Sequence, residues 1–135
     1  MIVVSNTSPL TNLAAIGQFE LLRKLYSEIH IADGVWDELN AYDQRWPGAD
    51  EVESASWIHQ HPVKNHLLVN ILRRDLDRGE SETIVLAEEL GADMVFLDEK
   101  EGRHAAQCIR GNLKQQAHNF VCCLPKQTNR RKEMN

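Results

Sequence analysis

The hydrophobic and polar positions of this chain fall into short apolar runs separated by longer segments with helical spacing. The apolar runs at 1–5 and 94–97 are typical of strands that are buried on both faces of a parallel sheet. Residues 29–31 and the alternating segment 57–63 are two further predicted strands. Pro62 confines the latter to an edge or an end of the sheet, because proline cannot donate a ladder hydrogen bond.

Between these runs, apolar residues recur every three or four positions, which predicts amphipathic helices. Ser8 is the expected N-cap of the first helix and Pro9 its first helical residue. Residues 42–56 are polar and predict a surface loop with one helical turn. The predicted helices cover 9–16, 19–25, 33–40, 67–76, 80–90 and 99–109.

Strands that alternate with helices predict an α/β fold with a mostly parallel sheet. Ligands of such sheets bind beyond the carboxyl ends of the strands. Asn6 follows the first predicted strand and Asp98 follows the strand at 94–97. We therefore expect these two side chains to meet at one edge of the sheet.

Composition fits a single soluble domain without a disulfide framework. The chain has 135 residues, of which 42% are hydrophobic and 26% charged, as in ordinary globular proteins. It contains no apolar run of membrane-spanning length and no secretory signal, so we expect no membrane association. Three cysteines without a C-x-x-C pair fit a reducing, cytoplasmic environment.

Charge is distributed unevenly along the chain. The total of 15 basic and 20 acidic residues gives a net charge of −5. Five of the basic residues and only one acid lie after position 110, so residues 1–110 carry a net charge of −9. A body this acidic is not a passive nucleic-acid binder, since phosphate affinity depends on Lys and Arg. Clustered acids can instead hold cations.

Several carboxylates are placed where such a cation site could form. Glu38 lies on the helix predicted at 33–40, and Glu80 and Glu82 lie in the first turn of the next long helix, where the helix dipole favours anions. Together with Asp98, they could converge on a hard cation that prefers oxygen ligands. Taken singly, each could equally be a solvated surface acid, which is the commoner role of Asp and Glu.

Histidines suggest a second, weaker candidate for metal binding. His59 and His61 lie two residues apart on one face of a predicted strand and could bind zinc together with His66. A zinc site usually requires four well-placed ligands, and no cysteine lies near these residues. The alternative is that these histidines are ordinary surface or strand residues.

Three segments together resemble one known family. They are IVVSNTSPLTNLAAIGQFELLRKLY, VWDEL and RGESETIVLAEELGADMVFLDEKEGR, in this order within residues 1–110. This pattern resembles PIN-domain proteins, in particular the prokaryotic PIN-like subfamily of unassigned function that is related to VapC-type toxins. The resemblance implies a three-layer α/β/α sandwich and a Mg²⁺- or Mn²⁺-dependent endoribonuclease. It also implies an RNA substrate, a cognate antitoxin and homodimer formation.

The resemblance also assigns site residues by position. The four acidic positions of the family fall at Asn6, Glu38, Glu82 and Asp98, and Glu80 is a weaker candidate for the third. Glu80 and Glu82 cannot point the same way on one helix, because two positions rotate the side chain by roughly 200°. The resemblance further assigns substrate contacts to Thr7 and Ser8, which follow the first acidic position, and to Arg103, for which an ion pair with Glu99 is the preferred interpretation.

The chain departs from the family pattern in two places. Asn6 stands where the family has an aspartate, which predicts weak metal binding and impaired hydrolysis. Residues 111–135 are basic and show little of the apolar periodicity of the family's last strand and helix. This segment is either the product of a frameshift near 111–114 or a divergent end of the domain that covers 1–110.

Two other functions remain open beside a ribonuclease. A non-catalytic PIN-like module that binds RNA or a protein would account for Asn6, but the retained Glu38, Glu82 and Asp98 argue against complete decay of the site. A signalling receiver domain is also acidic and binds Mg²⁺. It would require a pair of acids near the first strand and a lysine after the late strand, which Asn6 and Asp98 do not match.

Overall fold

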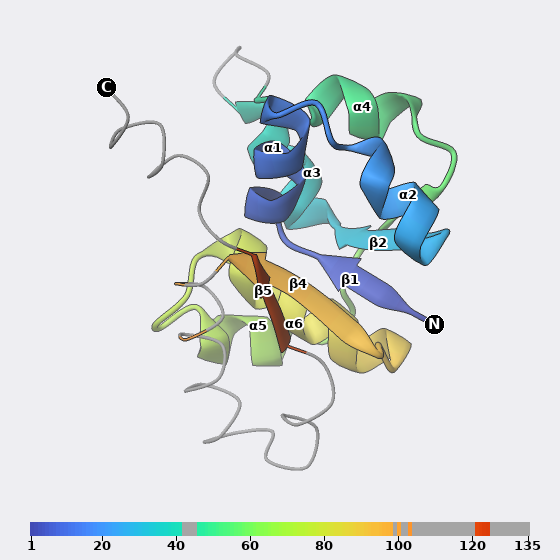
Figure 1. Ribbon diagram of the computed structural model, residues 1–135. Coiled ribbons are helices and arrows are strands. Elements are labelled where there is room, and N and C mark those ends of the chain that lie inside the picture. The colour runs from blue at the N-terminus through green and yellow to red at the C-terminus, as the bar shows by residue number, and fades with distance from the viewer. Residues whose placement is uncertain (42–45, 99, 101–102, 104–120, 125–135) are drawn as a thin grey trace.

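A five-stranded parallel sheet forms the centre of the molecule, with helices on both of its faces (Figure 1). The computed structural model describes residues 1–41, 46–98, 100, 103 and 121–124. The strand order β3-β2-β1-β4-β5 is that of an open α/β sheet that grows outward from β1 in both directions. The strands are β1 (Val3–Ser5), β2 (Ile29–Ala32), β3 (Ile58–His61), β4 (Met94–Asp98) and β5 (Val121–Leu124).

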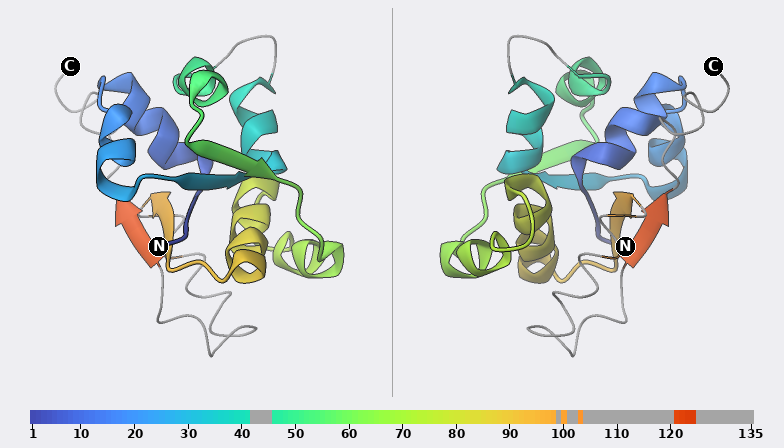
Figure 2. Two further views of the ribbon diagram at one scale, coloured as in Figure 1. Left: turned by 90° about the vertical axis from the view of Figure 1, so that its right-hand side faces the viewer. Right: turned by 90° about the vertical axis from the view of Figure 1, so that its left-hand side faces the viewer.

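The helices form two layers, one on each side of this sheet (Figure 2). One layer contains α1 (Thr7–Ala15), α2 (Glu20–Tyr26), α3 (Asp33–Leu39) and α4 (Ala49–Ser54), and the other contains α5 (His66–Leu72) and α6 (Arg78–Leu90). Both the α/β class and the three-layer α/β/α sandwich are thus confirmed. No helix of the described ranges has the length and apolarity needed to cross a membrane.

Alternation of side chains along each strand divides the core between the two layers. On β1, Val3 belongs to the cluster under α1–α4, whereas Val4 belongs to the cluster under α5 and α6, and both are fully buried. On α6, Ile84, Val85 and Leu86 are buried as the apolar pattern predicts. This packing fixes α1 and α6 on opposite faces of β1 and brings their N-termini to the carboxyl edge of the sheet.

The first helix begins two residues earlier than its sequence pattern predicts. Asn6, and not Ser8, occupies the N-cap position, and Pro9 is the third helical residue. Asn6 still pairs with the sheet through its backbone N–H, which donates to the Phe96 carbonyl over 3.0 Å. The chain therefore changes from strand to helix within a single residue, and the Asn6 side chain makes no capping bond.

Other elements agree with the pattern in type and differ at their ends. The helix expected at 80–90 begins at Arg78 after the N-cap Asp77 and ends at Leu90, and it is followed by the C-cap Gly91, whose φ of 62° favours glycine. Leu25 is exposed, although the pattern placed it on an apolar face, because α2 buries only one narrow stripe. Within the helix expected at 99–109 only residues 100 and 103 are described, and both are helical.

The sheet continues into the compositionally different segment after residue 110. β5 (Val121–Leu124) pairs in parallel with β4, with Val95 opposite Val121 and Asp98 opposite Leu124. β3 forms the opposite edge of the sheet, as Pro62 predicts. Asp98 is therefore the last residue of a strand that has neighbours on both sides.

Candidate functional site

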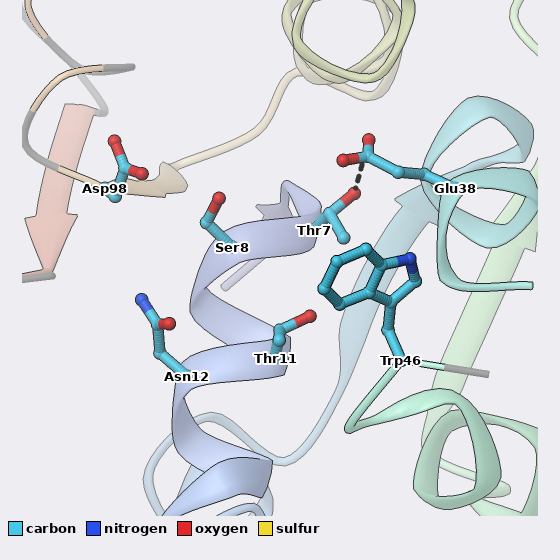
Figure 3. Close-up of a pocket in the computed structure, with 7 residues that line it drawn as sticks. All are labelled: Thr7, Ser8, Thr11, Asn12, Glu38, Trp46 and Asp98. Atoms are coloured by element: carbon cyan, nitrogen blue, oxygen red, sulfur yellow. Dashed lines mark hydrogen bonds between the residues drawn. The ribbon is translucent and has the colours of Figure 1, made fainter. Parts of the chain in front are cut away.

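A pocket of about 250 Å³ opens at the carboxyl edge of the sheet, beside the first turn of α1. It contains two of the predicted acids, Glu38 from α3 and Asp98 from the end of β4. Figure 3 shows their carboxyl groups on either side of α1, with the Thr7 and Ser8 side chains between them. The remaining lining residues are Thr11, Asn12 and Trp46.

Hydroxyl groups of α1 belong to this pocket, as the sequence predicts. Thr7 Oγ1 donates a hydrogen bond of 3.1 Å to Glu38 Oε2, which links the start of α1 to α3 (Figure 3). Ser8 points toward the Asp98 side of the pocket. Asp98 is only 6% exposed although it lines the pocket, so its carboxyl group is held in a largely desolvated place.

Asn6 does not line this pocket, and its side chain approaches the first turn of α6. It is 2% exposed, and its Oδ1 lies 3.3 Å from Thr83 Oγ1. A Cβ atom built on Gly79 would lie 3.3 Å from Asn6 Oδ1 and 2.8 Å from Glu38 Oε2. Asn6 and Glu38, the first and second predicted acidic positions, therefore meet over Gly79.

Glu82, the third predicted position, is directed elsewhere. Its Oε1 accepts a hydrogen bond of 2.9 Å from the Gly34 N–H at the start of α3, and its Oε2 accepts one of 2.7 Å from Arg78 Nε. Its side chain is 8% exposed and does not line the pocket. Through the hydrogen bond from Gly34, Glu82 connects α6 to α3.

Arg78 completes this connection between the two helices. Its Nη1 lies 2.9 Å from Asp37 Oδ2 on α3, while its Nε binds Glu82. The hydrogen bond to Glu82 is the main reason why the pKa of Arg78 is raised above its usual value. Arg78 therefore stays charged and holds α3, which carries Glu38, against α6.

The remaining predicted residues do not join the pocket. Glu80 lies in the first turn of α6, where its backbone N–H is capped by Asp77, and Arg103 is exposed. Glu99, the expected partner of Arg103, lies outside the described residues. Among the residues that the structure describes, no three or more His, Cys, Asp or Glu side chains are grouped closely enough to hold a metal ion.

Sequence reasoning missed the residues that position the predicted acids. Arg78 precedes Glu82 by four residues, a spacing that predicts an ion pair on a helix, and this signal could have indicated the role of Glu82. Gly34 and Gly79 both stand at the second position of a helix, which is a poor place for glycine unless space is needed. No sequence signal indicated Trp46.

The three histidines on β2 and β3 form a separate group. His30 Nδ1 lies 2.8 Å from His61 Nε2, and the His30 ring stacks on His59 at 5.2 Å between centroids. His66 lies at the start of α5 and is exposed. The zinc site suggested by the sequence is absent from the part of the chain that the structure describes.

Acidification should weaken this histidine group and destabilise the fold. Burial lowers the pKa of His30, His61 and His59 lower it further, and Glu28 acts weakly in the opposite direction. In the unfolded chain His30 takes up a proton near pH 6.5, whereas in the folded chain it resists protonation. Stability should therefore be retained above this pH and lost as pH falls below it.

Thermal unfolding of the wild type and His30→Gln between pH 8 and 5 measures this effect. The wild-type melting temperature should fall more steeply below pH 6.5 than that of the variant. Parallel curves would contradict a contribution from His30.

The fold and the pocket together define an α/β/α domain in which acids stand at the carboxyl edge of a parallel sheet. The sequence profile of one family, described as a PIN domain, matches residues 2–113. This chain therefore belongs to the PIN-domain family. The comparisons with curated proteins and with solved structures gave no match.

PIN domains are generally nucleases that use divalent metal ions, and the pocket offers the donors that such ions require. Glu38 and Asp98 present carboxylate oxygens there, which suit a hard cation, and the Asn6 amide lies outside the pocket lining, near Glu38 at Gly79. Mg²⁺ is commonly bound through one or two carboxylates while water and substrate phosphates fill its other positions. Glu38 and Asp98 supply two such carboxylates at one pocket, on either side of α1, and they do not form a closed protein cage.

Proposed function

We propose that this protein is a metal-dependent endoribonuclease of the PIN type, in which Asn6 impairs hydrolysis. The observation that supports it most is the pocket at the carboxyl edge, where Glu38 and Asp98 flank the hydroxyl groups of α1. Family membership supports the reaction class, and the oxygen donors support Mg²⁺ or Mn²⁺. The toxin-type role, the antitoxin partner, the homodimer and the cytoplasmic location belong to this proposal and rest on sequence resemblance and composition alone.

Glu38 and Asp98 would hold the metal ion, with the Asn6 amide oxygen as a weaker third donor. When bound, the ion supplies a water of lowered pKa and neutralises charge on the phosphoryl group. Thr7 holds the Glu38 carboxylate through its hydrogen bond and keeps it at the pocket. The Ser8 hydroxyl is placed to donate to a phosphate oxygen of RNA, because it lies between the two acids (Figure 3).

A non-catalytic PIN-like module that binds RNA or a protein is the second candidate. Two observations favour it: an amide replaces the first acid, and Glu82 is engaged by Gly34 and Arg78. The two candidates differ in what a divalent ion does. In a binding module, the ion would be dispensable and no phosphodiester bond would break.

Cleavage of a mixed RNA pool with and without Mn²⁺ tests the proposal. The wild type should cleave slowly with Mn²⁺ and lose this activity in EDTA. Asp98→Asn should reduce the cleavage rate at least about tenfold, because it removes a negatively charged ligand of the ion. Asp93→Asn, at the opposite end of β4, serves as the control and should leave the rate unchanged. Metal-independent binding without cleavage would instead identify a binding module.

A further inference from the structure

Helices α3 and α6 are joined by a reciprocal arrangement of glycine and glutamate. Each helix has a glycine at its second position, Gly34 on α3 and Gly79 on α6. Each glycine receives a glutamate side chain from the other helix: Glu82 lies against Gly34, and Glu38 lies against Gly79. The closest approach is that of Glu38 Oε2, 2.8 Å from where a Cβ atom of Gly79 would stand.

Backbone conformation does not explain why glycine stands at positions 34 and 79. The glycines with positive φ in the described ranges are Gly17, Gly48 and Gly91, and neither Gly34 nor Gly79 is among them. Glycine is a poor helix former, so alanine would favour α6 at position 79 if space allowed it. Position 79 therefore requires glycine because glycine has no side chain.

We propose that Gly79 is a positioning residue, which leaves room for the Glu38 carboxylate to meet Asn6 at the first turn of α6. This role deepens the proposed ribonuclease function, on which its consequence for metal binding rests. A methyl group at 79 would occupy the place next to Glu38 Oε2 and crowd Asn6 Oδ1 at 3.3 Å. Because Glu38 ends in a flexible carboxylate, the side chain would swing away while the helices stay packed.

Gly79→Ala should therefore displace Glu38 without unfolding the protein. The displacement has a direct readout that needs no metal ion, because Glu38 Oε2 also accepts the hydrogen bond from Thr7. In the wild type, Thr7→Val breaks this bond and should lower the melting temperature by about 2–4 °C. In the Gly79→Ala background, the bond is already lost and Thr7→Val should lower it by less than half as much.

Equal effects of Thr7→Val in the two backgrounds would overturn the proposal, because Glu38 would then not have moved. The single variant Gly79→Ala loses the same bond but gains the higher helix propensity of alanine, so it should melt within about 4 °C of the wild type. A larger fall would reveal a general loss of structure. Ser81→Ala is the matched control. It changes a buried side chain two residues further along α6, whose Oγ has no hydrogen-bond partner among the described residues, and it should leave the effect of Thr7→Val unchanged.

A second readout connects Gly79 to metal binding. In the Asn6→Asp protein, Gly79→Ala should weaken Mn²⁺ binding about tenfold in a calorimetric titration, whereas Ser81→Ala should not change it. If Asn6→Asp binds no Mn²⁺, the proposed function fails, and the melting experiment still decides whether Gly79 positions Glu38. If Asn6→Asp binds Mn²⁺ equally with and without Gly79→Ala, the function stands and the role of Gly79 in metal binding is refuted.

Discussion

Asn6→Asp should raise Mn²⁺-dependent cleavage of RNA by about ten- to hundredfold. The substitution keeps the shape of the side chain and exchanges an amide for a carboxylate at a position that is 2% exposed. Asn6 Oδ1 already approaches the same turn of α6 as Glu38, so the new charge would stand near the Glu38 carboxylate.

The size of the effect follows from electrostatics in a desolvated site. One added charge about 4 Å from a cation contributes about 4 kcal/mol per unit of cation charge at an effective dielectric constant of about 20. Burial of the carboxylate and repulsion from Glu38 offset much of this gain. A net gain of about 1.5–3 kcal/mol remains, which corresponds to about ten- to hundredfold tighter Mn²⁺ binding.

Three proteins make this prediction decisive. Wild type, Asn6→Asp and Asn6→Asp with Asp98→Asn should be compared in Mn²⁺ titration and in RNA cleavage. The double variant should return to the wild-type level or below it, because the charge gained at position 6 is offset by the charge lost at position 98. Asn6→Ala should bind no better than the wild type. An Asn6→Asp protein that is folded but no more active than the wild type would contradict the assignment of position 6 as an impaired metal ligand.

Without a metal ion, Asn6→Asp should instead cost stability. The carboxylate would be buried beside Glu38, where like charges repel and desolvation disfavours ionisation. The melting temperature in EDTA should therefore lie below that of the wild type, and added Mn²⁺ should reverse the difference. This opposite response in the two conditions separates a ligand role from a general change in packing.

The fold could be predicted from the sequence because its elements carry local signals. The apolar run that ends at Leu97 and the glycine at 91 mark the boundaries of β4 and α6 closely. The pattern places the start of α1 two residues too late, because two signals compete there. Ser8 and Pro9 form a good helix start, but sheet pairing holds Asn6 against Phe96 and brings the helix start forward.

The candidate site was predicted less completely, because side-chain direction depends on neighbours that are distant in sequence. Asn6 and Asp98 follow strands of one parallel sheet, so their shared edge can be read from the pattern. The direction of the Glu82 side chain cannot be read from the pattern, since it is set by the Gly34 N–H and by Arg78. The role of Glu82 as a metal ligand stays a prediction.

Arg78→Met should lower the free energy of unfolding by about 2–3 kcal/mol. Methionine keeps much of the apolar stem but removes the guanidinium group that neutralises Glu82. The Glu82 side chain is 8% exposed, so its carboxylate would remain buried with the hydrogen bond from the Gly34 N–H of α3 but without its counter-ion. Urea denaturation at neutral pH, compared with that of Arg74→Met as an exposed control, measures the loss.

Glu82→Gln removes the same ion pair from the other side and should cost less, about 1 kcal/mol. The amide oxygen can still accept from Gly34, and Arg78 remains half exposed and paired with Asp37. The double variant should be more stable than Arg78→Met alone, because no buried charge is left without its partner.

If Glu82 instead served chiefly as a ligand, Glu82→Gln in the Asn6→Asp protein would weaken Mn²⁺ binding at least about tenfold. From the contacts of Glu82 we expect a change of about twofold or less, since its two oxygens are already occupied in joining α3 to α6.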